Sequence, residues 1–223
     1  MDQPDIDPQL HAQALVGLAR VNRWSRTSNS LLKPITRLAR DRGAGMLSVL
    51  DVACGGADVS IRLVRLAFRH RLRLMLTGYD LSPTAVERAQ EAAEAAKVPA
   101  RFKVCDVLTE PFAMRFDIVM SSLFLHHLDD SQVVELLKKM AAAARELVVV
   151  SDLDRRPLGY LAAKVACRVL TRSPVVRVDG PRSVAAAFRP DELLRLSQDA
   201  GLSTARIQSA WPFRQLLSWE PAR

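Results

Sequence analysis

Short apolar runs alternate with amphipathic segments along most of the chain. Val-, Leu- and Ile-rich runs occupy residues 46–53, 72–80, 100–107, 115–122 and 145–153. Segments of helical character, at 58–66, 83–97 and 132–145, separate several of them. Buried parallel strands are apolar throughout, whereas surface helices have apolar positions spaced by three and four residues. The alternation therefore predicts an open α/β fold, with a mostly parallel sheet and helices on both of its faces.

The remaining segments predict one domain with additions to this sheet. Residues 188–201 indicate a helix that ends at a glycine, and 203–210 and 213–220 indicate two closing strands. Residues 9–40 suggest two amphipathic helices with a polar break at Ser25–Ser30. An insertion at 153–187 predicts a helix near 157–171 and a turn at Asp179-Gly180-Pro181. We divide the chain into an N-terminal helical cap (1–44), a core (45–152), an inserted cover (153–187) and closing elements (188–223).

The first apolar run ends in an acidic residue, Asp51, and a cluster of small residues. These small residues are Ala53, Gly55, Gly56 and Ala57. A strand, a tight turn of small residues and then a helix allow a ligand to approach the backbone and the free N–H groups of the helix N-terminus. The turn therefore predicts a ligand site, although such turns occur in many α/β folds.

The second and third runs also end in acidic residues. Asp80 lies 29 residues after Asp51, about one strand–helix–strand unit later, and Asp106 closes the third run. An ionised carboxylate at such a strand end can accept hydrogen bonds from two hydroxyls of a ribose. Ser82 and Pro83 then begin a helix as its N-cap and first residue.

Four segments, LDVACGGAD, GYDLS, VCDV and FDIVMSSLFLHHLDD, appear in order between residues 45 and 153. In this pattern the chain resembles the class I S-adenosylmethionine-dependent methyltransferases, close to the ubiquinone/menaquinone-type and small-molecule O-methyltransferases. The resemblance implies a seven-stranded Rossmann-like sheet whose last strand is antiparallel. It also implies S-adenosylmethionine as cofactor and S-adenosylhomocysteine as product.

The resemblance also implies roles for individual residues in holding the cofactor. Those on the methionine part are Asp51, Ala53, Gly55, Gly56, Ala57, Ser121 and Ser122; those on the nucleoside are Asp80, Leu81, Asp106 and Val107. Asp80 would bind the ribose hydroxyls, and Asp106 the adenine amine. The family usually has glycine where this chain has Ala53 and Ala57. We expect Ala57 to need φ < 0, with Gly56 supplying the conformational freedom.

Two further residues predict how an acceptor is activated. His126 follows the fourth run and Asp152 ends the fifth, so both belong at the carboxyl edge of the sheet. A histidine can take the proton of a phenol, and a carboxylate can fix its tautomer. The arrangement also resembles a His–Asp pair of some O-methyltransferases in this class. We expect His127 to be structural, because the helix cap Asp129 and Asp130 follows closely.

Composition excludes several other classes of protein. No apolar stretch approaches the roughly 20 residues that cross a bilayer, and the acidic start MDQPDIDPQ does not resemble a signal peptide. Three cysteines, at positions 54, 105 and 167, lack metal-ligand spacing. They favour a reducing cytoplasm and no metal site.

The net charge of +8 raises the alternative of a nucleic-acid substrate. The basic residues are scattered, however, and SSLF stands where methyltransferases of base amines carry (N/D)PP(Y/F). We therefore expect methylation of a hydroxyl on a small, largely apolar, phenolic or polyketide-like acceptor. Three alternative functions remain: C-methylation of a quinone-type ring, methylation of RNA or DNA, and service as a non-catalytic cofactor-binding subunit. The sequence is also compatible with a homodimer.

Overall fold

The apolar runs of the sequence form the strands of one sheet. The computed structural model describes residues 26–43, 45–170 and 173–221, and all statements below refer to them. Their elements are α2 (Thr27–Arg42), β1 (Met46–Val52), α3 (Asp58–Arg69), β2 (Arg73–Asp80), α4 (Pro83–Ala95), β3 (Ala100–Val104), β4 (Phe116–Ser122), a 3₁₀ turn η1 (Leu125–His127), α5 (Asp130–Ala143), β5 (Ala144–Leu153), α6 (Pro157–Leu170), α7 (Pro174–Ala186), α8 (Pro190–Asp199), β6 (Arg206–Ala210) and β7 (Arg214–Trp219).

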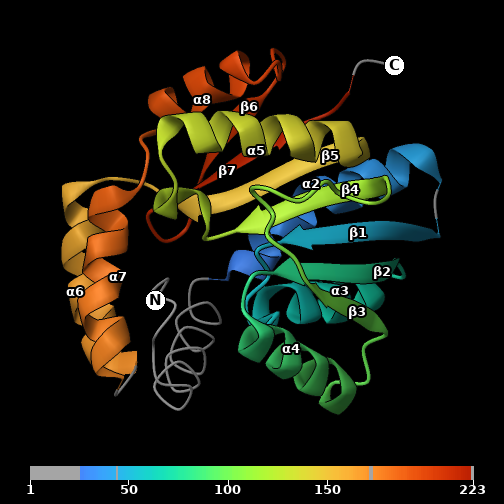
Figure 1. The fold of residues 1–223 in the computed structure, drawn as a ribbon, viewed down its shortest axis with the longest axis horizontal. Helices are drawn as coiled ribbons and strands as arrows, with labels where there is room; N and C mark the ends of the chain where they lie inside the picture. The colour runs from blue at the N-terminus through green and yellow to red at the C-terminus, as the bar shows by residue number, and fades with distance from the viewer. Residues whose placement is uncertain (1–25, 44, 171–172, 222–223) are drawn as a thin grey trace.

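The sheet is open, and its strands follow the order β3-β2-β1-β4-β5-β7-β6 (Figure 1). The first five strands pair in parallel, whereas β7 is antiparallel to both β5 and β6. The predicted fold is confirmed, including the antiparallel last strand. The strand order changes direction at β1, so the β1–β4 boundary is where such sheets bind ligands.

Helices cover both faces of the sheet and produce two apolar layers. On one face, α2, α3 and α4 pack over Leu47 and Val49 of β1. On the other, α5 and α8 pack over Leu50 and Val52 of the same strand. Successive side chains of a strand point to opposite faces, which explains why β1 is apolar at nearly every position.

The sequence predicted a break between two helices at Ser25–Ser30, but α2 begins at Thr27. The prediction is therefore wrong for residues 27–30, which are helical. Ser28 is buried, and its hydroxyl donates to the Val59 carbonyl at 2.9 Å, which compensates for its burial. Leu31 and Ile35 are fully buried in the layer beneath. α2 therefore packs in the helical layer on one face of the sheet, and the helix predicted before it lies outside the described residues.

The insertion forms a helical hairpin of α6 and α7. The helix predicted near 157–171 is present, but the predicted turn at Asp179–Pro181 is wrong, because α7 continues through these residues. Pro181 removes one helical hydrogen bond without ending the helix. A side chain at Gly180 would place its Cβ 2.4 Å from Cys167 Sγ. Gly180 therefore allows α6 and α7 to approach closely rather than forming a turn.

A single side chain of β7 holds both ends of this insertion. The Gln215 amide Nε2 donates to the Leu153 carbonyl at 2.9 Å and to the Phe188 carbonyl at 2.8 Å. Leu153 is the last residue of β5, and Phe188 comes just before α8. The hairpin thus leaves and re-enters the sheet layer at nearly the same place.

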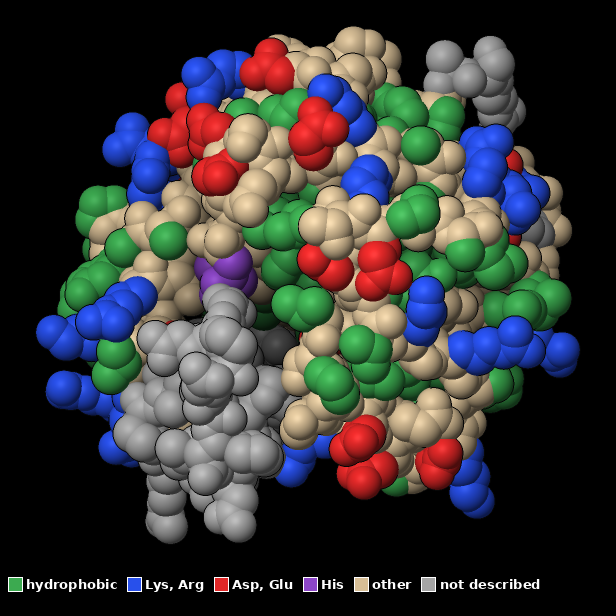
Figure 2. All heavy atoms as spheres, viewed as in Figure 1, with side chains coloured by type: hydrophobic (Ala, Val, Ile, Leu, Met, Phe, Trp, Pro, Cys, Tyr) green, Lys and Arg blue, Asp and Glu red, His purple; other side chains and the backbone are tan. Residues whose placement is uncertain are grey.

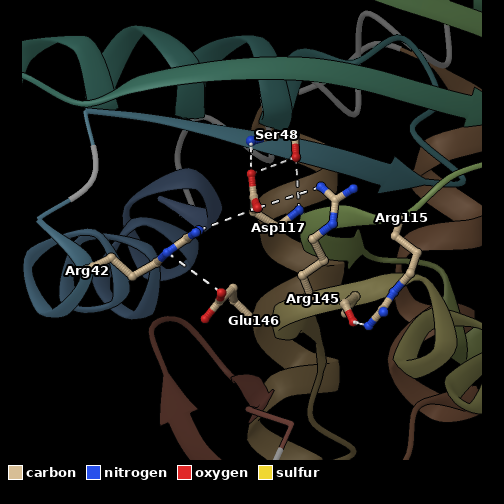
Figure 3. Close-up of polar contacts among 7 residues, drawn as sticks. Arg42, Ser48, Arg115, Asp117, Arg145 and Glu146 are labelled. Atoms are coloured by element: carbon tan, nitrogen blue, oxygen red, sulfur yellow. Dashed lines mark hydrogen bonds and ion pairs between the residues drawn. The ribbon is translucent and has the colours of Figure 1, made fainter. Parts of the chain in front are cut away.

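Asp117 organises the opposite edge of the sheet, where the parallel strands begin (Figure 3). Its Oδ2 accepts from the Ser48 amide at 2.8 Å and from the Ser48 hydroxyl at 2.7 Å. Arg42 and Arg145 lie at 3.4 and 3.9 Å from Oδ1. These hydrogen bonds lower the pKa of Asp117 although burial acts to raise it. Asp117 connects β4 with β1 and α2, and we therefore assign it a structural role.

Candidate active site

Most of the residues predicted for the site lie at or just beyond the carboxyl ends of β1, β2, β4 and β5. Asp51 and Val52 end β1, and Val52 pairs with Ser121 of β4. Ser122 in turn pairs with Ser151, one residue before Asp152. Because these strands are adjacent, the residues share one edge of the sheet.

The loop after β1 has left-handed backbone at three alternate residues. Ala53, Gly55 and Ala57 have φ values of 56°, 54° and 55°. The expectation that Ala57 has φ < 0 and that Gly56 supplies the freedom is therefore wrong. Ala57 precedes the first residue of α3, so its left-handed conformation sets the direction of that helix. This backbone keeps the glycine-like path that the family pattern suggested, with alanine at two of its positions.

Relieving this strain is expected to stabilise the protein. Left-handed backbone costs a non-glycine residue roughly 1–2 kcal/mol, while glycine adds about 0.4–1 kcal/mol of unfolded-chain entropy. Ala53→Gly should therefore raise the free energy of unfolding by about 0.5–1 kcal/mol, measured by urea denaturation. Gly56→Ala is the matched control, because its Cβ would contact nothing within 4 Å and its φ is not positive. Lower stability of Ala53→Gly would contradict the strain.

Asp51 is a buried carboxylate surrounded by other acids. Its side chain is only 1% exposed, and Oδ1 accepts no hydrogen bond from the described residues. Burial raises the pKa of Asp51 to about 7; a hydrogen bond from Ser60 opposes this shift, and the charges of Asp58 and Asp80 add to it. Such a carboxylate is suited to a cationic ligand group, which would relieve both the desolvation and the repulsion.

The raised pKa gives the protein without ligand a specific pH dependence. Asp51 binds a proton more tightly when folded than when unfolded, so its contribution to stability is present at low pH. That contribution is lost as pH rises through about 7. The wild type should thus lose stability between pH 5 and pH 8.5, whereas Asp51→Asn should not. The free energy of unfolding of the variant, relative to that of the wild type, should rise by at least about 1.4 kcal/mol over this range. Parallel curves for the two proteins in urea denaturation would contradict a raised pKa.

Asp80 holds the turn and presents an apolar neighbour. Its Oδ2 accepts from the Gly55 amide at 2.7 Å, and Oδ1 accepts from the Ser82 amide at 3.0 Å. Ser82 caps α4 through its hydroxyl, as predicted. Leu81 is 68% exposed, which is unusual for leucine and leaves an apolar surface beside the carboxylate. A flat apolar ring with an adjoining pair of hydroxyls would suit this combination.

Asp106 lies on the loop after β3, and its own turn uses both carboxylate oxygens. Oδ1 accepts from the Leu108 amide at 2.9 Å and Oδ2 from the Thr109 hydroxyl at 2.8 Å. These hydrogen bonds lower the pKa of Asp106, and the one from the Thr109 hydroxyl has the largest effect. Val107 beside it is buried, and its carbonyl accepts from Lys139 of α5 at 2.6 Å. Lys139 thereby fixes this loop. This role was missed from the sequence, because nothing in the Ala-rich segment around Lys139 indicated it.

Ser121 and Ser122 end β4 but differ in their surroundings. Ser121 is fully buried, and its hydroxyl donates to the Val52 carbonyl at 2.9 Å. Ser122 is half-buried. Ser121 therefore fixes the spacing of β1 and β4 at the site, whereas Ser122 keeps part of its surface accessible.

The structure brings His126 and Asp152 into direct contact. His126 Nδ1 lies 2.6 Å from Asp152 Oδ1, and the His126 amide donates to Oδ2 at 3.2 Å. Both side chains are buried, and the Leu153 amide also donates to Oδ1 at 2.7 Å. Burial acts to raise the pKa of Asp152, but the His126 charge and these hydrogen bonds lower it. When the imidazole is neutral, an ionised Asp152 favours the tautomer with the proton on Nδ1, which leaves a lone pair on Nε2.

His127 is exposed and lies against the ring of its neighbour. The centroids of His126 and His127 are 4.2 Å apart, with the rings tilted by 39°. Asp129 caps α5 and accepts from the Gln132 amide at 2.9 Å, as the sequence indicated. Figure 2 shows histidine surface on the face that carries this edge of the sheet.

Comparisons with known proteins identify a methyltransferase domain in the chain. Residues 49–146 match a family model described as a methyltransferase domain. A 27-O-demethylrifamycin SV methyltransferase of Amycolatopsis mediterranei is 34% identical over 116 residues, covering 48% of this chain and 40% of that protein. A ubiquinone biosynthesis O-methyltransferase of Leptothrix cholodnii is 27% identical over 160 residues, covering 70% of this chain and 64% of that protein. The chain thus spans less than two thirds of either relative.

The fold also matches solved methyltransferases. The magnesium protoporphyrin IX methyltransferase of Synechocystis PCC 6803, solved with bound S-adenosylmethionine, superposes with a TM-score of 0.62 at 15% identity. The superposition covers 99% of this chain and 100% of that one. At this identity the similarity shows the fold and leaves the acceptor open.

Proposed function

Because the chain belongs to the class I S-adenosylmethionine-dependent methyltransferases, we propose that it methylates a hydroxyl of a small, largely apolar, phenolic or polyketide-like acceptor. The contact between His126 and Asp152 carries the proposal, since it supplies a buried base at the edge where ligands bind. The names of both relatives also describe O-methylation.

The residues at β1 and β2 fit the cofactor by their chemistry. The buried Asp51 oxygen that lacks a hydrogen bond among the described residues suits the cationic amino group of the methionine part. Asp80 suits the ribose hydroxyls, and the exposed Leu81 suits the adenine. Asp106 suits the adenine amine. The carboxylates of Asp80 and Asp106 both accept hydrogen bonds within their own turns, and each oxygen can accept a second one from a ligand. When bound, S-adenosylmethionine supplies an electrophilic methyl group on a sulfonium.

His126 would act as general base for the acceptor hydroxyl. A phenol has an ordinary pKa of about 10 and histidine about 6.5, so neutral imidazole takes the proton as the new bond to oxygen forms. Asp152 fixes the tautomer with Nδ1–H and stabilises the imidazolium that results. Burial of both side chains excludes water from the proton transfer.

The α6–α7 hairpin would form one wall of the acceptor site. α7 packs against η1, which carries His126, and both helices lie beside the carboxyl ends of the strands (Figure 1). Methyl transfer needs the reacting atoms in line at about 3–3.5 Å, and an open sheet edge cannot impose that alignment. The hairpin is therefore proposed as the part that selects the acceptor.

Transfer of a ¹³C-labelled methyl group to a panel of phenols and polyketide-like molecules tests the function. We expect the label in an O-methyl ether, which has a carbon chemical shift distinct from that of a C-methyl group. Label on a ring carbon would replace the proposal by C-methylation. Binding of S-adenosylhomocysteine without transfer to any member of the panel would favour a non-catalytic subunit.

A further inference from the structure

The outer side of α6 is apolar, although most surface helices place polar residues there. Leu158, Leu161, Val165 and Val169 are 69, 58, 56 and 77% exposed. Their spacing of three and four residues aligns them along one stripe of the helix. Cys167, by contrast, is buried on the side that meets Gly180 of α7. The helix is therefore apolar both where it packs and where it faces solvent.

The turn between β6 and β7 extends this apolar surface. Trp211 and Phe213 are 57 and 37% exposed. A Cβ on Gly159 would lie 3.1 Å from Phe213 Cβ, which places the turn against the first residues of α6. Tyr160 of α6 is 44% exposed, but its position two residues after Leu158 places it off the stripe. Trp favours the boundary between water and lipid, because its ring is apolar at one end and polar at the other.

Positive charge accompanies the stripe. Residues 153–187 contain seven Lys and Arg against two Asp, so they hold five of the eight excess positive charges of the chain. Arg155 pairs with Glu192 and Arg156 with Asp154. Lys164 and Arg168 are exposed, each directly before a residue of the stripe, and neither has an ion pair with a described residue. No acidic residue in the described part of the chain therefore neutralises these two cations.

We propose that α6 and the β6–β7 turn form a docking surface for the anionic face of a lipid bilayer. The stripe would enter the boundary between headgroups and acyl chains, and Lys164 and Arg168 would bind lipid phosphates. No helix among the described residues is long and apolar enough to cross a membrane, so this contact lies on the surface. Association of two copies through this face would bring the same cations together, which makes the anionic surface the better partner.

Docking through α6 would place the acceptor site close to the membrane. α7 connects the docking helix to η1, since it contacts both. An apolar acceptor dissolved in the bilayer could then reach the site without crossing water. The docking surface does not depend on the proposed chemistry, because lipid binding requires no turnover.

Sedimentation of the full chain with vesicles tests this surface. We expect binding to vesicles of equal phosphatidylglycerol and phosphatidylcholine, and at least tenfold weaker binding to phosphatidylcholine alone. Lys164→Ala with Arg168→Ala should weaken binding roughly tenfold or more, because each cation near such a surface contributes about fivefold. Val165→Asp should weaken it by a similar factor, by placing a charge in the stripe.

Matched substitutions at the opposite edge of the sheet provide the control. Phe68 of α3 is 70% exposed, and Arg65 and Arg69 beside it are exposed too. Phe68→Asp and the double variant Arg65→Ala, Arg69→Ala should leave vesicle binding within twofold of the wild type. Equal losses from both sets of substitutions, or no binding to either vesicle, would overturn the proposal. Sedimentation equilibrium that gives a dimer which Val165→Asp dissociates, without vesicle binding, would assign the surface to self-association instead.

Discussion

Replacing His126 by alanine is expected to lower kcat for the true acceptor by about 10²-fold or more, while the affinity for the cofactor stays nearly unchanged. The imidazole is the proposed base for the hydroxyl proton, and it contacts Asp152 rather than the loop after β1. Asp152→Asn should lower kcat similarly, because an amide neither fixes the Nδ1–H tautomer nor stabilises imidazolium. Single-turnover kinetics with the acceptor and calorimetry with S-adenosylhomocysteine check the two halves of this expectation.

His127→Ala is the matched control for the base. Its ring centroid lies 4.2 Å from that of His126, but the residue is exposed, whereas His126 is the residue whose Nδ1 lies 2.6 Å from Asp152 Oδ1. We expect His127→Ala to keep kcat within about threefold of the wild type, far from the 10²-fold general-base effect. If His126→Ala turns over the true acceptor almost normally, general-base O-methylation by this residue is wrong.

Removing the Asp80 carboxylate should weaken cofactor binding by roughly 30- to 150-fold, equivalent to about 2–3 kcal/mol for charged hydrogen bonds to two hydroxyls. The same substitution also removes the acceptor of the Gly55 amide, which lies 2.7 Å from Oδ2. Asp80→Asn separates these effects, because it keeps an oxygen for that amide but loses the negative charge. Calorimetric titration of each variant with S-adenosylhomocysteine measures the loss.

Asp106→Ala provides the comparison at the next strand end. Its carboxylate stabilises the turn through the Leu108 amide and the Thr109 hydroxyl. We expect a smaller loss of affinity than for Asp80→Ala, together with reduced stability of the loop. Unchanged affinity in Asp80→Ala would remove that residue from the site, whatever the result at Asp106.

The main elements of the fold were predictable because each depends on local chemistry. The apolar runs that became β1 and β5 need only burial on both faces, and Ser82 and Asp129 are caps that act within one turn of their helices. The errors arose where tertiary contacts override local preference. Ser28 joins a helix because the Val59 carbonyl accepts its hydroxyl, and α7 continues through Gly180 because Cys167 packs against it.

The site divides in the same way. Strand-end acids such as Asp51 and Asp80 follow from the register of the α/β units, so the sequence could indicate them. The left-handed backbone of Ala57 was missed because alanine rarely adopts it, although the glycine that the family usually has at this position was a signal for positive φ. Lys139 is separated by about thirty positions from the carbonyls it binds, and a lysine in an Ala-rich helix usually faces solvent.

The two hydrogen bonds of the Gln215 amide make the α6–α7 hairpin an exchangeable module. Because Leu153 and Phe188 are joined to the same side chain, a replacement segment needs only to begin and end at that point. Closing a loop of different length there costs little, since each doubling adds only about 0.6 kcal/mol of entropy. Chimeras cut at these two residues could therefore exchange acceptor range between relatives while Asp117 and the opposite edge keep the sheet intact.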